Sequence, residues 1–156
     1  MFIESDIMEI IIEKLKIKDI DEVLKLYEKL VPVKQDYELS KKKYKDLYYS
    51  DKYTVLVAKS DDKILGTITS IVCDSIGFGG YSFMILDYLY VKEEYRNIGI
   101  ATKLFENIEN IAVSNNCGYI FFVSSSNNTE AHKLYEKLGY NDNVVGFRKV
   151  LIKNGE

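Results

Sequence analysis

Apolar and polar residues repeat along the first half of the chain with the periods of helices and strands. Helical spacing or β-branched composition predicts, in chain order, a strand at 8–15, helices at about 18–30 and 40–49, and strands at 53–58 and 64–73. Pro32, the only proline, stands just past the first of these helices. The last two strands are joined by the short polar stretch 60–63, which favours an antiparallel hairpin.

The second half of the chain has the pattern of alternating strands and helices. Residues 83–91 form a nearly unbroken apolar run, which is typical of a central strand covered on both faces. The elements expected after it are a helix at 98–113, a strand at 119–123, a helix at 128–138 and a last strand at 144–152. Gly139 stands where a left-handed cap would end the second of these helices. This order predicts one α/β sheet with helices on both faces.

Composition and charge agree with one globular domain and disfavour several partners. The chain has 156 residues, 47% of them hydrophobic, so we expect a single domain over 1–156 with its core at about 8–153. The net charge of −3 repels nucleic acid and anionic membranes. Cys73 and Cys117 lie in apolar stretches without metal-binding spacing, which favours reduced thiols, although one disulfide stays open. With no signal-peptide pattern and no membrane-length apolar run, we expect a soluble cytoplasmic protein.

The stretch 96–102, between the apolar run and its helix, has the features of an anion-binding turn. A helix N-terminus exposes unpaired N–H groups and the positive end of a dipole, yet the first acidic residue of this helix is Glu106. Gly99 and the small Ala101 allow an oxygen to approach the backbone, and Arg96 can add a charge-assisted contact. The alternative is an ordinary tight turn in which the glycine serves the backbone alone.

This turn and its surroundings resemble motif A of the GNAT superfamily of N-acetyltransferases. The motif A signature Arg/Gln-x-x-Gly-x-Gly/Ala is matched by Arg96, Gly99 and Ala101, and residues 89–91 match the strand before it. Residues 128–131 and 134–140 are similar to motif B. Both motifs occur in the family's order and distance. The resemblance covers about residues 8–152, and motifs A and B are its specific parts.

The resemblance implies a fold and a co-substrate. The fold class is α/β, the GNAT fold, in which a mixed central sheet has antiparallel N-terminal strands, a splayed parallel centre and helices on both faces. The co-substrate is acetyl-CoA, with no metal; pantetheine pairs with the strand and the pyrophosphate lies on the turn. The cofactor-binding residues that the resemblance implies are Leu89, Tyr90, Val91, Arg96, Asn97, Ile98, Gly99, Ile100, Ala101, Thr102, Asn128 and Tyr135.

Asp87 is the first catalytic candidate. It is the only charged residue between Phe83 and Val91, and a buried unpaired carboxylate is costly enough to need a reason. Desolvation would make it a better base. By resemblance it stands where many GNAT enzymes carry a glutamate that accepts the substrate proton, often through water. The alternative is a structural acid, paired with a lysine or placed at a sheet bulge.

Tyr135 and Asn128 are the candidates from the motif B helix. Tyr135 lies on the apolar face of that helix, so packing is one interpretation. By resemblance it is the general acid near the coenzyme sulfur. Asn128 matches a residue that hydrogen-bonds pantetheine, whereas Asn127 and Glu130 have the pattern of a helix-capping pair, which would give this stretch a structural role.

These patterns predict an acetyl-CoA-dependent N-acetyltransferase. It would move an acetyl group to a primary amine of a small molecule or peptide, by direct transfer in a ternary complex, with Asp87 as base and Tyr135 as acid. A GNAT-fold module that binds acyl-CoA as a sensor without turnover is the alternative. A nucleotide-binding α/β domain is a further one, but the turn lacks both the Lys-Ser/Thr of a P-loop and the spaced glycines of a Rossmann fold.

The acceptor is the least defined part of this hypothesis. The tyrosines of the second predicted helix, with the acids beside them, can be read as the wall of an acceptor pocket or as core; they are Asp36, Tyr37, Glu38, Tyr44, Tyr48 and Tyr49. His132, the sole histidine, is expected on the surface. GNAT proteins are often dimers, so the resemblance also leaves a homodimer open.

Overall fold

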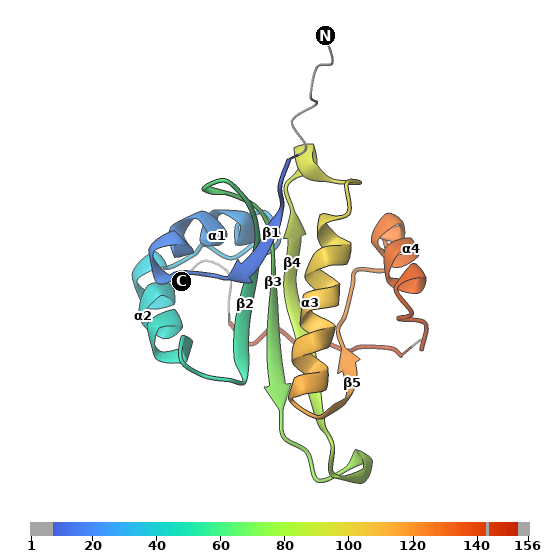
Figure 1. The fold of residues 1–156 in the computed structure, drawn as a ribbon. Coiled ribbons are helices and arrows are strands. Elements are labelled where there is room, and N and C mark those ends of the chain that lie inside the picture. Colours follow the sequence, from blue (N-terminus) through green and yellow to red (C-terminus); the bar gives the residue numbers. More distant parts are fainter. Residues whose placement is uncertain (1–7, 143, 153–156) are drawn as a thin grey trace. The chain divides into compact units, whose positions relative to one another are not determined.

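A computed structural model describes residues 8–142 and 144–152 of the chain. It contains two compact units, one ending at Phe121 and one beginning at Phe122, and each is described by itself. The first holds β1 (Ile11–Lys14), α1 (Ile20–Tyr27), α2 (Tyr37–Leu47), β2 (Tyr53–Ser60), β3 (Lys63–Cys73), β4 (Ser82–Val91), α3 (Ile100–Ser114) and β5 (Cys117–Phe121), and the second holds α4 (Thr129–Lys137) (Figure 1). Short 3-10 turns lie at Ile17–Asp19, Phe78–Gly80 and Glu93–Tyr95. The expectation of one domain stays a prediction.

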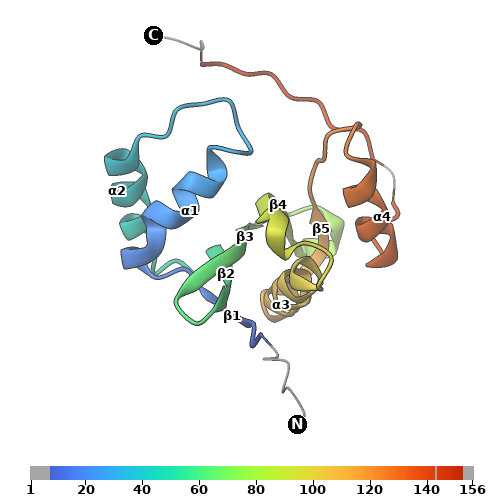
Figure 2. The same cartoon turned by 90° about the horizontal axis from the view of Figure 1, so that it is seen from above.

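The strands of the first unit form one mixed sheet in the order β1-β2-β3-β4-β5. The first four strands are antiparallel, and β5 lies parallel to β4. Seen from above, α1 and α2 lie on one face of this sheet and α3 lies on the other (Figure 2). These observations confirm the predicted mixed α/β class, and the predicted hairpin is the pair β2 and β3.

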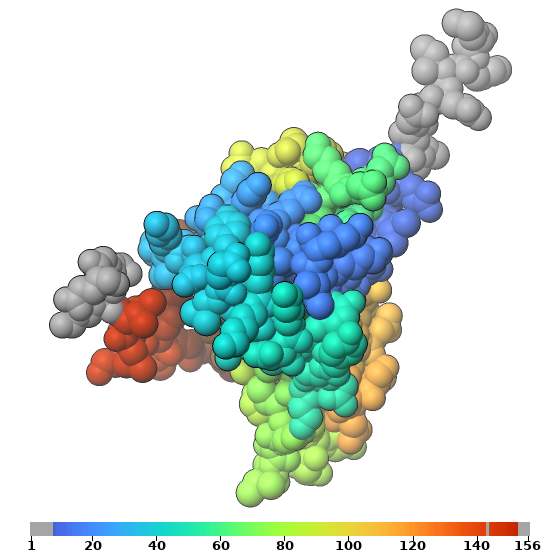
Figure 3. Space-filling view, turned by 90° about the vertical axis from the view of Figure 1, so that its left-hand side faces the viewer, coloured from blue at the N-terminus to red at the C-terminus, as the bar shows by residue number. Residues whose placement is uncertain are grey.

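Each helix of the first unit packs buried apolar side chains on the sheet. The buried side chains of α3 are Ile100, Leu104, Phe105, Ile108 and Ala112. On the opposite face, α1 and α2 share a hydrophobic core with the strands. Figure 3 shows this side of the unit, where α1, α2 and the loop between them form the surface. Burial of these stripes removes apolar area from water and fixes both helix layers on the sheet.

The second helix begins earlier than predicted because a polar side chain starts it. The carboxylate of Asp36 accepts a hydrogen bond from the N–H of Leu39 at 2.9 Å, so α2 starts at Tyr37 rather than near residue 40. Tyr44 is the buried residue of this helix, and its O–H donates to the carbonyl of Leu15 at 2.6 Å.

The prediction of a last strand at 144–152 is wrong. These described residues form no strand, and their apolar side chains are exposed, with Phe147 95% exposed. A run of β-branched residues becomes a strand only when another strand supplies hydrogen-bond partners, and among the described residues of the second unit there is no such strand. The predicted cap at Gly139 is confirmed by its φ of +94°.

Among the described residues, no helix has both the length and the apolar character needed to cross a lipid bilayer.

The packing of α3 generates a stability prediction. Leu104 is 0% exposed, so Leu104→Ala leaves a cavity and should lower the free energy of unfolding by about 2 to 5 kcal/mol in urea titration. Val113→Ala, on the same helix but 78% exposed, is the control and should change it by less than about 0.5 kcal/mol. Equal losses for the two variants would contradict the placement of α3.

Candidate functional site

A β-bulge in β4 breaks the regular alternation of its side chains. The pairing of β3 with β4 runs as far as Asp87 and resumes at Tyr90, so Ile68 of β3 lies opposite both Tyr88 and Leu89. Tyr88 has a φ of +50°, which is unusual for a bulky residue. The extra residue re-aims the side chains on either side of it.

The bulge turns two consecutive side chains toward α1. The ring of Tyr27 stacks on Tyr88 with centroids 4.5 Å apart, and the Tyr27 hydroxyl shares a 3.0 Å hydrogen bond with the hydroxyl of Thr69. Asp87 is the register partner of Thr69, and directly paired residues lie on the same face of a sheet. Asp87 and Tyr88 therefore share the face that a regular strand would give to only one of them.

Asp87 is exposed, so the prediction of a buried carboxylate is wrong. The uniform apolar run indicated a strand covered on both faces, but the bulge brings this position to the surface. One carboxylate oxygen accepts a 2.8 Å hydrogen bond from the N–H of Tyr88, within the bulge itself. The alternative of an acid at a sheet bulge thus describes the local structure, and one oxygen remains open to water or a ligand.

Beyond the bulge, one edge of β4 is open. The parallel pairing with β5 extends only from Ser82 to Ile85 of β4, opposite residues 117–121. From there to Val91, none of the described strands pairs with β4 on this side. Unpaired strand edges present N–H and C=O groups that bind extended chains, and residues 89–91, predicted to bind pantetheine, belong to this edge.

The open edge leads directly into the turn at 96–102. Asn97 and Gly99 both have positive φ, at +62° and +88°, and Gly99 is the N-cap of α3. This backbone shape points successive N–H groups to one side, as in anion-binding loops. Ala101 and Thr102 follow in the first turn of the helix, which begins two residues later than predicted.

The start of α3 is left without compensation by the chain. It has no side-chain cap and no acid in its first turn, which confirms the pattern read from the sequence. Within the described residues, the backbone N–H groups from 98 to 102 donate to no acceptor. Together with the helix dipole, these donors form a site for a phosphate oxygen.

Arg96 is held between the strand and the turn. Its Nε donates a 2.9 Å hydrogen bond to the carbonyl of Val91, and its guanidinium lies 5.4 Å from the ring centroid of Tyr90. The side chain is exposed. Since guanidinium carries five N–H donors, the terminal amino groups keep their capacity for a phosphate while Nε fixes their orientation.

Asn128 caps α4 in the second unit. Its side-chain oxygen accepts from the N–H of Ala131 at 3.4 Å, whereas Glu130 forms an ion pair with Lys133 at 2.9 Å. The predicted capping pair of Asn127 and Glu130 is therefore wrong, since the cap lies one residue later. The cap uses only the oxygen, so the amide NH2 group of Asn128 can donate to a ligand.

Tyr135 is half-buried within the same unit. Its ring meets Phe122 edge-on with centroids 4.8 Å apart, and the half-buried His132 ring lies 6.3 Å away. Burial raises the pKa of the Tyr135 phenol above its ordinary value of 10.0, and a hydrogen bond with Ser124 partly opposes this. The phenol is therefore protonated at neutral pH and has a proton to donate.

Tyr44 of α2 has a structural role, which favours the core interpretation for this residue. It is buried, and its O–H donates to the backbone carbonyl of Leu15. Asp36 caps the helix, and the O–H of Tyr37 donates to Glu28 at 3.0 Å.

Instead, other tyrosines surround Asp87, and the sequence patterns did not reveal them. Tyr53 stands two residues before Val55, the register partner of Thr69, so it also faces α1. Burial raises the pKa of Tyr53, and Tyr88 and Asp87 raise it further. We refer to Tyr27, Tyr53 and Tyr88 as the tyrosine cluster. These tyrosines lie on three separate elements, so the sequence alone does not show that they come together; the bulge in β4 is needed to place them on one face.

Comparison with known proteins agrees with this geometry. The model of the acetyltransferase (GNAT) family matches residues 20–140. No curated protein matches the sequence.

Solved structures share the fold at low sequence identity. An acetyltransferase from Trypanosoma brucei is 19% identical with a TM-score of 0.80, covering 92% of this chain and 100% of its own. Glucosamine-6-phosphate N-acetyltransferase from Arabidopsis thaliana is 19% identical with a TM-score of 0.79, covering 92% and 99%. An aminoglycoside N-acetyltransferase in complex with CoA is 18% identical with a TM-score of 0.76, covering 90% and 95%. At such identities these likenesses show the fold.

An isosteric pair of variants tests the anion site. Thr102 is the third residue of α3, a position where the negative charge of a glutamate interacts favourably with the helix dipole. Thr102→Glu should therefore raise the free energy of unfolding by about 0.3 to 1 kcal/mol. The same charge repels a phosphate, so the affinity for coenzyme A in calorimetric titration should fall roughly tenfold. Thr102→Gln, the uncharged control, should keep more of that affinity. Identical affinities for the two variants would place the anion elsewhere.

Proposed function

Because the chain belongs to the acetyltransferase (GNAT) family, we propose that it is an acetyl-CoA-dependent N-acetyltransferase. It acts on a primary amine of a small molecule or peptide by direct transfer in a ternary complex. The observation that carries the proposal is the continuity between the open edge of β4 and the uncapped, acid-free start of α3. An extended chain that ends in a pyrophosphate matches this pair of features, because the open edge supplies both N–H donors and C=O acceptors and the turn supplies N–H donors alone.

The cofactor assignment follows the local geometry. The pyrophosphate would be held by the N–H groups from 98 to 102 and by Arg96, and the pantetheine by the backbone at 89–91. By resemblance to the family, we propose that the amide NH2 group of Asn128 donates a further hydrogen bond to the pantetheine. Among the similar structures, one is in complex with CoA, which supports the choice of cofactor.

Asp87 is the proposed base. The attacking amine must be neutral, and the proton it loses must have an acceptor. The open oxygen of the Asp87 carboxylate can take that proton through a bridging water, which the short aspartate side chain requires. Because the bulge fixes the carboxylate against the N–H of Tyr88, its position is set before the substrate binds.

Tyr135 is the proposed acid. As the amine nitrogen bonds to the acetyl carbon, the carbon–sulfur bond breaks and the departing sulfur needs a proton. Burial keeps the Tyr135 phenol protonated, so it can supply one. The single-domain organisation over residues 1–156, the cytoplasmic location, the homodimer option and the absence of a metal, nucleic acid or membrane partner stay predictions.

Release of free thiol from acetyl-CoA tests the proposal most directly. The panel of acceptors contains polyamines, amino acids, aminoglycosides and peptides with free N-termini. Thiol release that depends on an added amine supports N-acetyl transfer. Binding of acetyl-CoA without release on any amine would favour the sensor, and binding of ATP or NAD but not coenzyme A would overturn the cofactor assignment.

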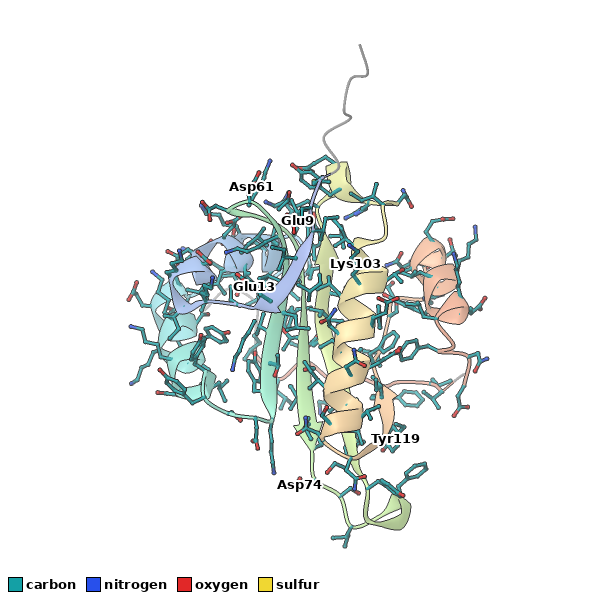
Figure 4. All side chains as sticks on the ribbon, viewed as in Figure 1. Glu9, Glu13, Asp61, Asp74, Lys103 and Tyr119 are labelled. Carbon is teal, nitrogen blue, oxygen red and sulfur yellow. The ribbon has the colours of Figure 1, made fainter. Side chains whose placement is uncertain are left out.

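The role of Asp87 predicts a changed pH profile. Asp87→Asn should lower the maximal rate roughly 100-fold and remove the rise of rate with pH that a general base produces. Asp74→Asn is the matched control, because Asp74 pairs with Lys52 at the end of the sheet opposite to the start of α3 (Figure 4). A profile unaltered in Asp87→Asn would return this residue to a structural role.

The role of Tyr135 predicts a separation of rate from affinity. Tyr135→Phe should lower the maximal rate roughly 100-fold while the affinity for acetyl-CoA changes little. Because the pKa of the phenol is raised, the wild-type rate should not fall through loss of this proton until the pH exceeds 10.0. Tyr49→Phe, at a residue 89% exposed, serves as control. Unchanged turnover in Tyr135→Phe would remove the acid role.

A further inference from the structure

The tyrosine cluster and Asp87 form one side of the bulge, and the proposed mechanism uses only the carboxylate. The rings of Tyr27 and Tyr88 are stacked at 4.5 Å with an interplanar angle of 29°. Tyr53 faces the same side of the sheet. Tyr27, Tyr53 and Tyr88 are half-buried residues, and Asp87 is exposed. The chain therefore presents aromatic faces and a negative charge together.

The electrostatic character of this place is uniform. The pKa of Tyr88 is raised by burial and by the Asp87 charge, and that of Tyr53 by burial, Tyr88 and Asp87. An anion placed here would meet the like charge of Asp87, whereas an ammonium group would meet both a carboxylate and ring faces that attract cations.

The cluster also lies at the part of β4 that an acceptor must reach. If the cofactor chain follows the open edge from the turn toward the bulge, its reactive end arrives beside residues 87–89. The α1 face of the bulge is then the side from which an amine meets Asp87. The cluster stands on that face and does not depend on the anion site for its own structure.

We propose that the tyrosine cluster and Asp87 bind the acceptor and select cationic amines, with an aliphatic diamine or polyamine as the substrate class, against amines that carry a phosphate or carboxylate. The proposal rests on the proposed function, since it places the acceptor of that reaction. One nitrogen reacts as the neutral amine beside Asp87, and a second remains an ammonium held against the rings of the tyrosine cluster.

Matched pairs of acceptors test the selectivity. Cadaverine and lysine differ by one carboxylate, and glucosamine and glucosamine 6-phosphate by one phosphate. The member without the anion should have the higher kcat/KM in each pair, with cadaverine ahead of lysine by at least roughly tenfold. Equal values, or a preference for the anionic members, would overturn the proposal while leaving N-acetyl transfer intact.

A pair of variants at one position separates the ring face from simple packing. Tyr88→Leu removes the aromatic face and should raise the KM for cadaverine by about 2- to 30-fold, with kcat changed less. Tyr88→Phe keeps the face and should stay near the wild-type KM. If both variants behave alike, the ring does not bind the ammonium and the proposal fails at this residue.

Binding measured without turnover keeps the two proposals distinguishable. Calorimetric titration of the full chain, saturated with coenzyme A, should detect cadaverine and not lysine. If cadaverine binds but no amine is acetylated, the cluster is a cation site and the acetyltransferase proposal fails. If another amine is acetylated while cadaverine neither binds nor reacts, the selectivity is overturned.

Discussion

The single extra residue in β4 is the constraint on which the site depends. It places Asp87 and Tyr88 on one face, and it occurs close to where the pairing with β5 ends. Three contacts hold it: the stack of Tyr27 on Tyr88, the bond between Tyr27 and Thr69, and the bond from the Tyr88 N–H to Asp87. Strain at the positive φ of Tyr88 is thus offset by a helix packed against the strand.

The open edge of β4 connects two ends of opposite charge. At the α3 end, unpaired N–H groups, a helix dipole and the Arg96 guanidinium are positive. At the bulge end, Asp87 is negative, and its charge raises the pKa of the neighbouring Tyr53 phenol. A ligand that carries phosphates at one end and meets an amine at the other has a definite direction along this edge.

Features encoded by neighbouring residues could be predicted, whereas those set by distant partners could not. The missing acid and Gly99 are local, and they predicted the uncapped, acid-free helix start that α3 has. The bulge has no such signature, because Tyr88 and not a glycine holds the positive φ within a uniform apolar run. The prediction of a strand at 144–152 was wrong for the same reason, since β-branched residues need a partner strand that local sequence does not specify.

The open edge of β4 also has a meaning for the protein in the absence of its ligand. A strand with unpaired backbone groups is a template on which another chain can add, and proteins normally cover or shorten such edges. If the cofactor binds as proposed, the uncovered part is the part that serves binding, so a lysine, a proline or a permanent strand could not block it without loss of the site. The cofactor would then act as a removable edge strand, and the contacts that hold it would also protect the sheet from association with itself.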